Sequence, residues 1–220
     1  MQFIALQYKA NWKFIKSKLA RLFWLNCIFF CLITFLLYLY LAKHPEFGQA
    51  IMSGFSQSKQ DIVTRQDIVT SMRTQNTSSS YFWAHMRTTG LLFLNNIKVN
   101  LLFSVLGVLS FMAFPTIILA VNSFVMAAAL AVRNMPFKVL FFGIMPHGIF
   151  ELSSWFLAAA IGFYFSINLC EIYLKKPHDS VKYVFKNAGI CFLLFVVPLT
   201  VIAAFVEAFL TPEIYKWFVK

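Results

Sequence analysis

Long runs without a charged side chain restrict this sequence to a small set of folds. Residues 22–42 contain no Asp, Glu, Lys or Arg, and neither does the run from Val99 to Val132. As one straight helix the second run would be about 50 Å long, whereas the hydrocarbon core of a bilayer is about 30 Å thick. Overall 60% of the residues are hydrophobic and 12% are charged, against about 25% charged in a soluble domain. The sequence therefore predicts an all-α, polytopic transmembrane helical bundle.

We expect about five membrane spans, separated by prolines or by polar loops. Their approximate ranges are 22–42, 97–114, 116–132, 147–170 and 188–210. Pro115 lies in the middle of the second uncharged run and disfavours a continuous helix, so that run is predicted to form a tight hairpin. Thr211-Pro212 is expected to end the last span.

The segment around Pro146 and Gly148 is predicted to be a broken helix. Proline removes a backbone hydrogen bond from a helix, and glycine weakens the helix next to it. We expect a short half-helix at about 136–145, followed by a full helix that begins near His147.

The basic residues predict which end of the chain faces the cytoplasm. Residues 1–21 contain several Lys and Arg and no acid, and their apolar residues recur at helical spacing, which indicates an amphipathic helix on the membrane surface. Residues 171–187 carry four more lysines. The positive-inside rule then puts the N-terminus in the cytoplasm and residues 43–96 outside, as a helical, polar loop. Residues 97–220 are expected to form a transmembrane domain. We expect a multi-pass membrane protein with a cytoplasmic N-terminus.

Three ionisable side chains fall at membrane depth, namely His147, Glu151 and Glu207. Such groups are expensive in a bilayer unless they are paired or face a cavity. His147 and Glu151 are four residues apart, so one helix presents both on one face. Glu207 could reach that face if the last span packs against it. The predicted polar core consists of Asn95, Asn96, Pro146, His147, Gly148, Glu151 and Glu207, with Asn100 and Asn122 as further candidate partners.

Three roles for His147, Glu151 and Glu207 remain open. They could satisfy one another and fix the helix register. They could form a catalytic or metal-binding centre, with one carboxylate acting as a base. They could also line a path for a proton or a solute, since broken helices build many transporter sites, although five spans would then require a homodimer. The sequence contains no HExxH, paired-His or Ser/Lys signature, so it predicts no metal, no cofactor and no confident catalytic residue, and the chain is not expected to be an enzyme.

Four blocks of the sequence, in this order and spacing, resemble one family of membrane proteins. They are Leu94–Val99 (LNNIKV), Ile144–Leu152 (IMPHGIFEL), Ala158–Gly162 (AAAIG) and Ala204–Pro212 (AFVEAFLTP). Together they are similar to the stage II sporulation protein M family of bacteria and archaea, over roughly residues 85–215.

The resemblance implies two kinds of function. The family's namesake acts with a pair of peptidoglycan hydrolases during engulfment in sporulating bacteria, as a membrane scaffold. This implies a scaffold for a cell-envelope process such as sporulation or peptidoglycan remodelling. Related proteins accompany circular bacteriocin genes, which implies maturation or export of a peptide as the alternative. The expected partners are the lipid bilayer, other membrane or envelope proteins and a second copy of the chain. The formal charge of +11 is explained by residues flanking the spans, so nucleic acid is not an expected partner.

Overall fold

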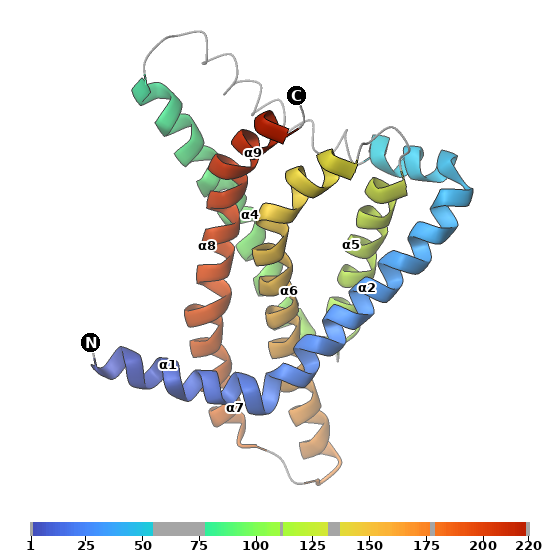
Figure 1. The fold of residues 1–220 in the computed structure, drawn as a ribbon. Helices are drawn as coiled ribbons and strands as arrows, with labels where there is room; N and C mark the ends of the chain where they lie inside the picture. Colours follow the sequence, from blue (N-terminus) through green and yellow to red (C-terminus); the bar gives the residue numbers. More distant parts are fainter. Residues whose placement is uncertain (1, 55–77, 111, 132–136, 177–178, 219–220) are drawn as a thin grey trace. The chain divides into compact units, whose positions relative to one another are not determined.

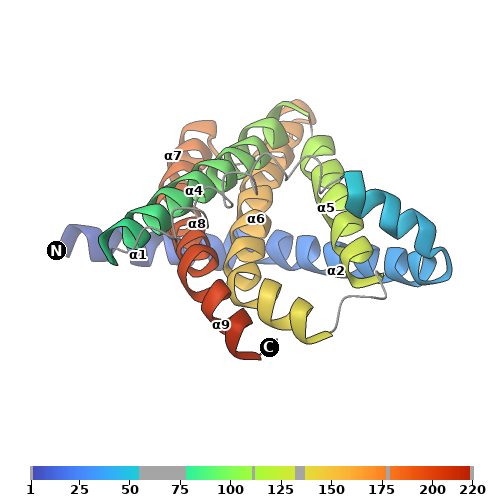
Figure 2. The same ribbon diagram turned by 90° about the horizontal axis from the view of Figure 1, so that it is seen from above.

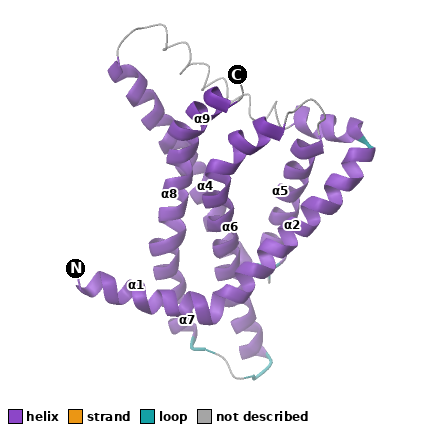
Figure 3. Ribbon diagram, in the orientation of Figure 1, coloured by secondary structure: helices purple, strands orange, loops and turns teal. Residues whose placement is uncertain are grey.

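The chain folds into helices, as the uncharged runs predict. A computed structural model describes residues 2–54, 78–110, 112–131, 137–176 and 179–218. Throughout these residues the secondary structure is helical, with short connecting loops and no strand (Figure 3). The expected all-α class is confirmed.

The helices are named as in Figure 1, with η marking π-helical turns. Their bounds are α1 Gln2–Phe14, η1 Ile15–Leu19, α2 Ala20–Lys43, α4 Ser78–Leu109, α5 Ala113–Ala131, α6 Phe137–Tyr173, α7 Val181–Cys191, η3 Phe192–Val196, α8 Val197–Phe205, η4 Val206–Leu210 and α9 Thr211–Phe218. Residues 45–54 are also helical.

The number of spans agrees with the prediction. Five helical stretches are long and apolar enough to cross a membrane, and they are Leu6–Lys43, Phe82–Val108, Ala113–Ala131, Phe141–Tyr173 and Val181–Ile214. Several begin earlier than expected, because the helices continue through polar residues that the charge pattern assigned to loops. The second stretch, for example, takes in residues 82–96, which were expected to lie outside the membrane. The part of the predicted polar loop at 55–77 lies outside the described residues.

Three predicted breaks differ from the structure. The helix does not break at Pro146–Gly148, because α6 is one continuous helix with Pro146 inside it. Neighbouring groups commonly let a membrane helix accommodate a proline in this way. Pro115 lies in the first turn of α5, where proline is tolerated. The break before it includes Met112, whose φ of 73° lies in the left-handed region. Finally, α9 continues beyond Thr211-Pro212.

The described residues form two compact units, and the long helices contribute to both. The first unit comprises Met1–Cys31, Asn96–Ala120 and Phe150–Val201. It contains a hydrogen-bonded contact around the fully buried Asn100 of α4. The Asn100 amide donates to Ser154 Oγ of α6 at 3.1 Å and to Thr200 Oγ1 of α8 at 2.9 Å. One asparagine therefore fixes three helices against each other.

Small residues bring α4 and α6 into close contact within the first unit. A Cβ built on Gly162 would lie 2.5 Å from the carbonyl oxygen of Phe103, so only glycine fits there. Two serine hydroxyls bridge the same interface: Ser104 Oγ donates to Ala158 O at 3.1 Å, and Ser166 Oγ donates to Gly107 O at 2.5 Å. Membrane helices commonly associate through such small residues and hydroxyl bonds.

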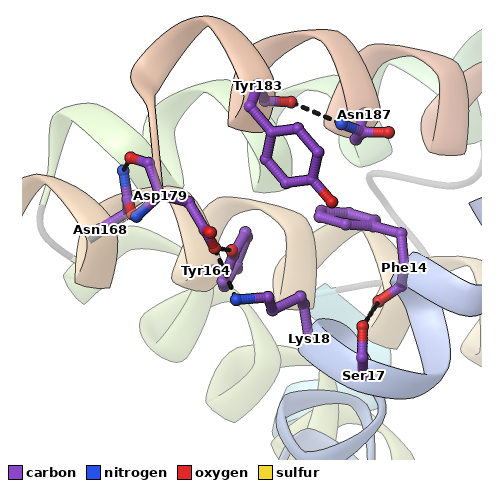
Figure 4. Close-up of polar contacts among 8 residues, drawn as sticks. All are labelled: Phe14, Ser17, Lys18, Tyr164, Asn168, Asp179, Tyr183 and Asn187. Carbon is purple, nitrogen blue, oxygen red and sulfur yellow. Dashed lines mark hydrogen bonds and ion pairs between the residues drawn. The ribbon is translucent and has the colours of Figure 1, made fainter. Parts of the chain in front are cut away.

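A polar contact joins the N-terminal segment to the connection between α6 and α7 (Figure 4). Lys18 Nζ of η1 lies 2.6 Å from Asp179 Oδ2, and the hydroxyl of Tyr164 also donates to that carboxylate. The amide of Asn168 exchanges two 2.9 Å hydrogen bonds with the backbone of Asp179. The basic N-terminal segment and the α6–α7 connection therefore lie at the same end of this unit.

The second unit comprises Leu32–Asn95, Val121–Ile149 and Ile202–Lys220. It contains a small apolar cluster where the end of α2 and the helical segment 45–54 pack on α5. The buried members are Leu41, Ala127, Ala128 and Ala131, with Leu37, Ile51 and Met52 packed against them. This unit also holds the end of α8, η4 and α9, which follow one another as one helical stretch (Figure 2).

Candidate functional site

The π-helical turn η4 contains Glu207 and is explained by the proline that follows it. Proline lacks an N–H and crowds the carbonyl four residues earlier, which for Pro212 is that of Ala208. The helix widens over Val206–Leu210, and the N–H of Thr211 bonds to the carbonyl of Val206, five residues back. The turn η3 has the same relation to Pro198. Single π-turns are frequent at functional sites, so η4 draws attention to Glu207.

His85 of α4 supports this turn from the side. Its Nδ1 lies 2.7 Å from the carbonyl oxygen of Ala208, the group that Pro212 deprives of a helical donor. Because a carbonyl only accepts hydrogen bonds, Nδ1 of His85 must carry the proton. The imidazole ring also packs on Phe209, with ring centroids 5.1 Å apart. His85 therefore contacts η4 at the two residues that follow Glu207.

His147 of α6 contacts the residue that ends the same turn. Its Nδ1 lies 3.3 Å from Thr211 Oγ1, and that hydroxyl donates its one proton to Val206 O at 3.2 Å. The threonine oxygen must then accept from His147, which puts a proton on Nδ1. In a neutral ring the lone pair is therefore on Nε2, the atom that can accept a proton or ligate a cation.

Glu207 and His147 come together in the structure. Each offers a potential ligand atom, and these atoms lie within 4.8 Å of each other. Glu151 is one turn beyond His147 on the same continuous helix, so the helix itself fixes it on the His147 face. All three side chains are half-buried. Among the residues that the structure describes, Glu207 makes no hydrogen bond or ion pair.

The other residues predicted for the polar core lie in different settings. Pro146 and Gly148 flank His147 within α6, half-buried and buried respectively. On α4, Asn96 is buried whereas Asn95 is exposed, as expected for neighbours on a helix. Asn100, which the sequence makes a candidate partner of the carboxylates, donates its amide to Ser154 and Thr200.

Sequence reasoning missed two residues of this site, His85 and Thr211. His85 was assigned to a polar loop, and no local pattern links it to a carbonyl far away in the chain. For Thr211 the sequence predicts only the end of a span. The signal that could have found both is Pro212, because a proline inside a helix leaves a carbonyl that another group must satisfy.

The arrangement supports proton exchange or cation binding. It joins an imidazole with a defined tautomer to a carboxylate without a partner among the described residues, and a second carboxylate follows on the histidine's own helix. His147 and Glu207 lie in the second unit, and an ionisable side chain within a candidate membrane span is a functional-site hypothesis. The fold and this cluster define the class: a multi-pass helical membrane protein with a histidine–glutamate polar centre.

Comparison with known proteins identifies the family. A family model described as Stage II sporulation protein M matches residues 19–212. The chain belongs to this family. An uncharacterised protein of the archaeon Methanocaldococcus jannaschii is 32% identical over 128 residues, which covers 54% of this chain and 68% of that protein. No solved structure shows significant similarity to the chain.

Proposed function

We propose that the chain is a non-enzymatic membrane scaffold that holds partner proteins during a cell-envelope process of the sporulation or peptidoglycan-remodelling type. The observation that carries this proposal is the apolar surface of the stretch Leu6–Lys43, of which the most apolar window is only 11% buried. On α2, Trp24 and Ile28 are each about 60% exposed. This surface is available for helices of other membrane proteins, and membership of the family supports that use of it.

A crosslinking experiment in native membranes tests the scaffold. A photoreactive residue at Ile28 should form a discrete adduct with an envelope protein that mass spectrometry identifies. The matched control is Phe30, two residues along the same helix and only 5% exposed, where no adduct should form. Adducts with lipid alone at Ile28 would contradict the scaffold proposal.

The orientation that fits this role puts the N-terminus in the cytoplasm of a bacterial cell. Lysines gather in residues 9–18 and again at 175–186, and the contact between Lys18 and Asp179 keeps these two regions together. The positive-inside rule favours a cytoplasmic location for such a basic end.

A second candidate function is supported by the geometry of the polar centre. In this alternative the chain takes part in the maturation or export of a peptide, or in transport of a small solute, and uses His147, Glu151 and Glu207 chemically. The observation that favours it is the approach of Glu207 to His147 at a π-helical turn.

Isosteric variants separate the two functions. Glu151→Gln and Glu207→Gln keep side-chain shape and remove charge. Normal protein abundance with loss of the cellular activity would favour the chemical role, whereas a collapse of abundance would favour a structural role. The neighbouring genes give an independent indication: wall hydrolases favour the scaffold, and a small hydrophobic peptide with an ABC transporter favours the alternative.

A further inference from the structure

We propose that His147 and Glu207, with Glu151 on the next turn of α6, bind a divalent transition-metal ion. This goes beyond the scaffold role, which needs no ion. The sequence predicted no metal, because the three residues match no known spacing and Glu207 is far from the others along the chain. The structure brings Glu207 to His147 and thereby changes that expectation.

Charge is the first reason for an ion at this position. A charged side chain within a membrane span is costly unless it is paired or faces a cavity. Glu207 has neither an ion pair nor a hydrogen bond within the described part of the chain. A bound divalent cation would give the carboxylate of Glu207 a partner.

Distance is the second reason. In a tetrahedral zinc site the ligands lie about 2.0–2.2 Å from the ion, so two ligand atoms are roughly 3.4 Å apart. The potential ligand atoms of Glu207 and His147 lie within 4.8 Å of each other. Closing that difference requires a movement of about 1.4 Å or less, which a rotation of the long glutamate side chain supplies.

Orientation of the imidazole is the third reason. Metal-ligating histidines almost always donate their other ring N–H to an oxygen, which fixes the tautomer and the ring plane. His147 makes this contact through Nδ1 to Thr211 Oγ1. The threonine is itself held by Val206 O, and His85 supports the same turn. A bound ion would therefore meet a histidine whose second nitrogen is already engaged.

The donor set indicates the class of ion. Imidazole nitrogen favours Zn²⁺, Fe²⁺, Ni²⁺ and Cu²⁺, whereas carboxylates alone suit Mg²⁺ and Ca²⁺. One nitrogen and two carboxylates leave positions for water or for another ligand. Zn²⁺ is the appropriate probe, with Mg²⁺ as the comparison.

The test measures metal binding to the full-length protein in detergent after treatment with a chelator. We expect about one Zn²⁺ per chain by elemental analysis after desalting, with a higher unfolding temperature, and no comparable effect of Mg²⁺. Glu207→Gln and His147→Gln should each abolish stoichiometric binding. The matched controls are Glu213→Gln on α9 and His44→Gln in the exposed pair with Glu46, and both should bind as the unmodified protein does.

Two further variants keep the proposal testable where a ligand variant does not fold. Thr211→Val removes the hydroxyl that orients His147 and leaves every ligand in place. It should raise the dissociation constant for Zn²⁺ roughly 10–100-fold. Cys27→Ser with Cys31→Ser tests thiol binding, because these residues are also one turn apart on a helix and should not contribute.

Each outcome of the Zn²⁺ binding test either supports or overturns the proposed site. The site is supported if Glu207→Gln or His147→Gln loses Zn²⁺, or if Thr211→Val binds it more weakly. In either case the control variants and the cysteine variant should still bind Zn²⁺. The proposed site is overturned if Zn²⁺ binding persists in every ligand variant or disappears only in the cysteine variant. Failure of the unmodified protein to bind Zn²⁺ also overturns it. None of these results depends on the crosslinking from Ile28, so the two proposals succeed or fail separately.

Discussion

At the scale of single residues, the contact between α4 and α6 is set by Gly162. A Cβ at this position would lie 2.5 Å from Phe103 O and 3.2 Å from the Cα of Gly107. Those neighbours are backbone atoms in helices and cannot move aside cheaply. Overpacking of this kind typically destabilises by about 1–3 kcal/mol. We therefore expect Gly162→Ala to lower the free energy of unfolding in detergent by an amount in that range.

Gly189 is the matched control for this prediction. It lies within α7, and a Cβ there would meet no atom within 4 Å. Gly189→Ala should leave stability unchanged or raise it slightly, because alanine favours a helix over glycine. Equal stability of Gly162→Ala and the unmodified protein would show that α4 and α6 do not pack as closely as described.

At the scale of elements, prolines set the shape of the last helix. We expect Pro212→Ala to restore a backbone N–H opposite Ala208 O, to close the π-turn η4 and to rotate the residues after it. His85 should then lose its carbonyl partner, and His147 should lose Thr211. The measurement is the ¹⁵N spectrum of labelled histidines, which distinguishes Nδ1–H from Nε2–H.

Pro198→Ala is the internal control for this element. It removes the proline after η3, a turn that no described histidine contacts, so the signals of His85 and His147 should not change. Unchanged histidine signals in Pro212→Ala would mean that Pro212 does not hold η4 open.

The elements also show how far the sequence could predict this fold and site. Long apolar runs predicted the five spans, and the spacing of His147 and Glu151 placed both on one face of a helix. Helix ends were less predictable, since Pro115 and Pro146 are tolerated within helices and α4 continues through polar residues to Ser78. The approach of Glu207 to His147 depends on tertiary packing, which no local pattern contains. His85 and Thr211 belong to the site through contacts with single backbone oxygens, and residue type alone does not identify those.

At the scale of the whole molecule, the contact between Lys18 and Asp179 predicts that the N-terminal segment and the α6–α7 connection share one side of the membrane. The N-terminal segment and the α6–α7 connection are held together. The uncharged residues 22–42, within the candidate span Leu6–Lys43, separate Lys13 from Glu46. With the cytoplasmic N-terminus proposed above, single cysteines introduced as Lys13→Cys and Lys182→Cys should react alike with a membrane-impermeant maleimide, and only after the cells are permeabilised.

Glu46→Cys should show the opposite behaviour and react in intact cells. Each position is exposed, so access to the reagent depends on the side of the membrane and not on burial. The native cysteines are a constant background, which the unmodified protein measures. Different labelling of Lys13→Cys and Lys182→Cys would contradict the contact through Asp179. The same labelling for all three positions would mean that residues 6–43 do not cross the membrane, and the count of five spans would then be wrong.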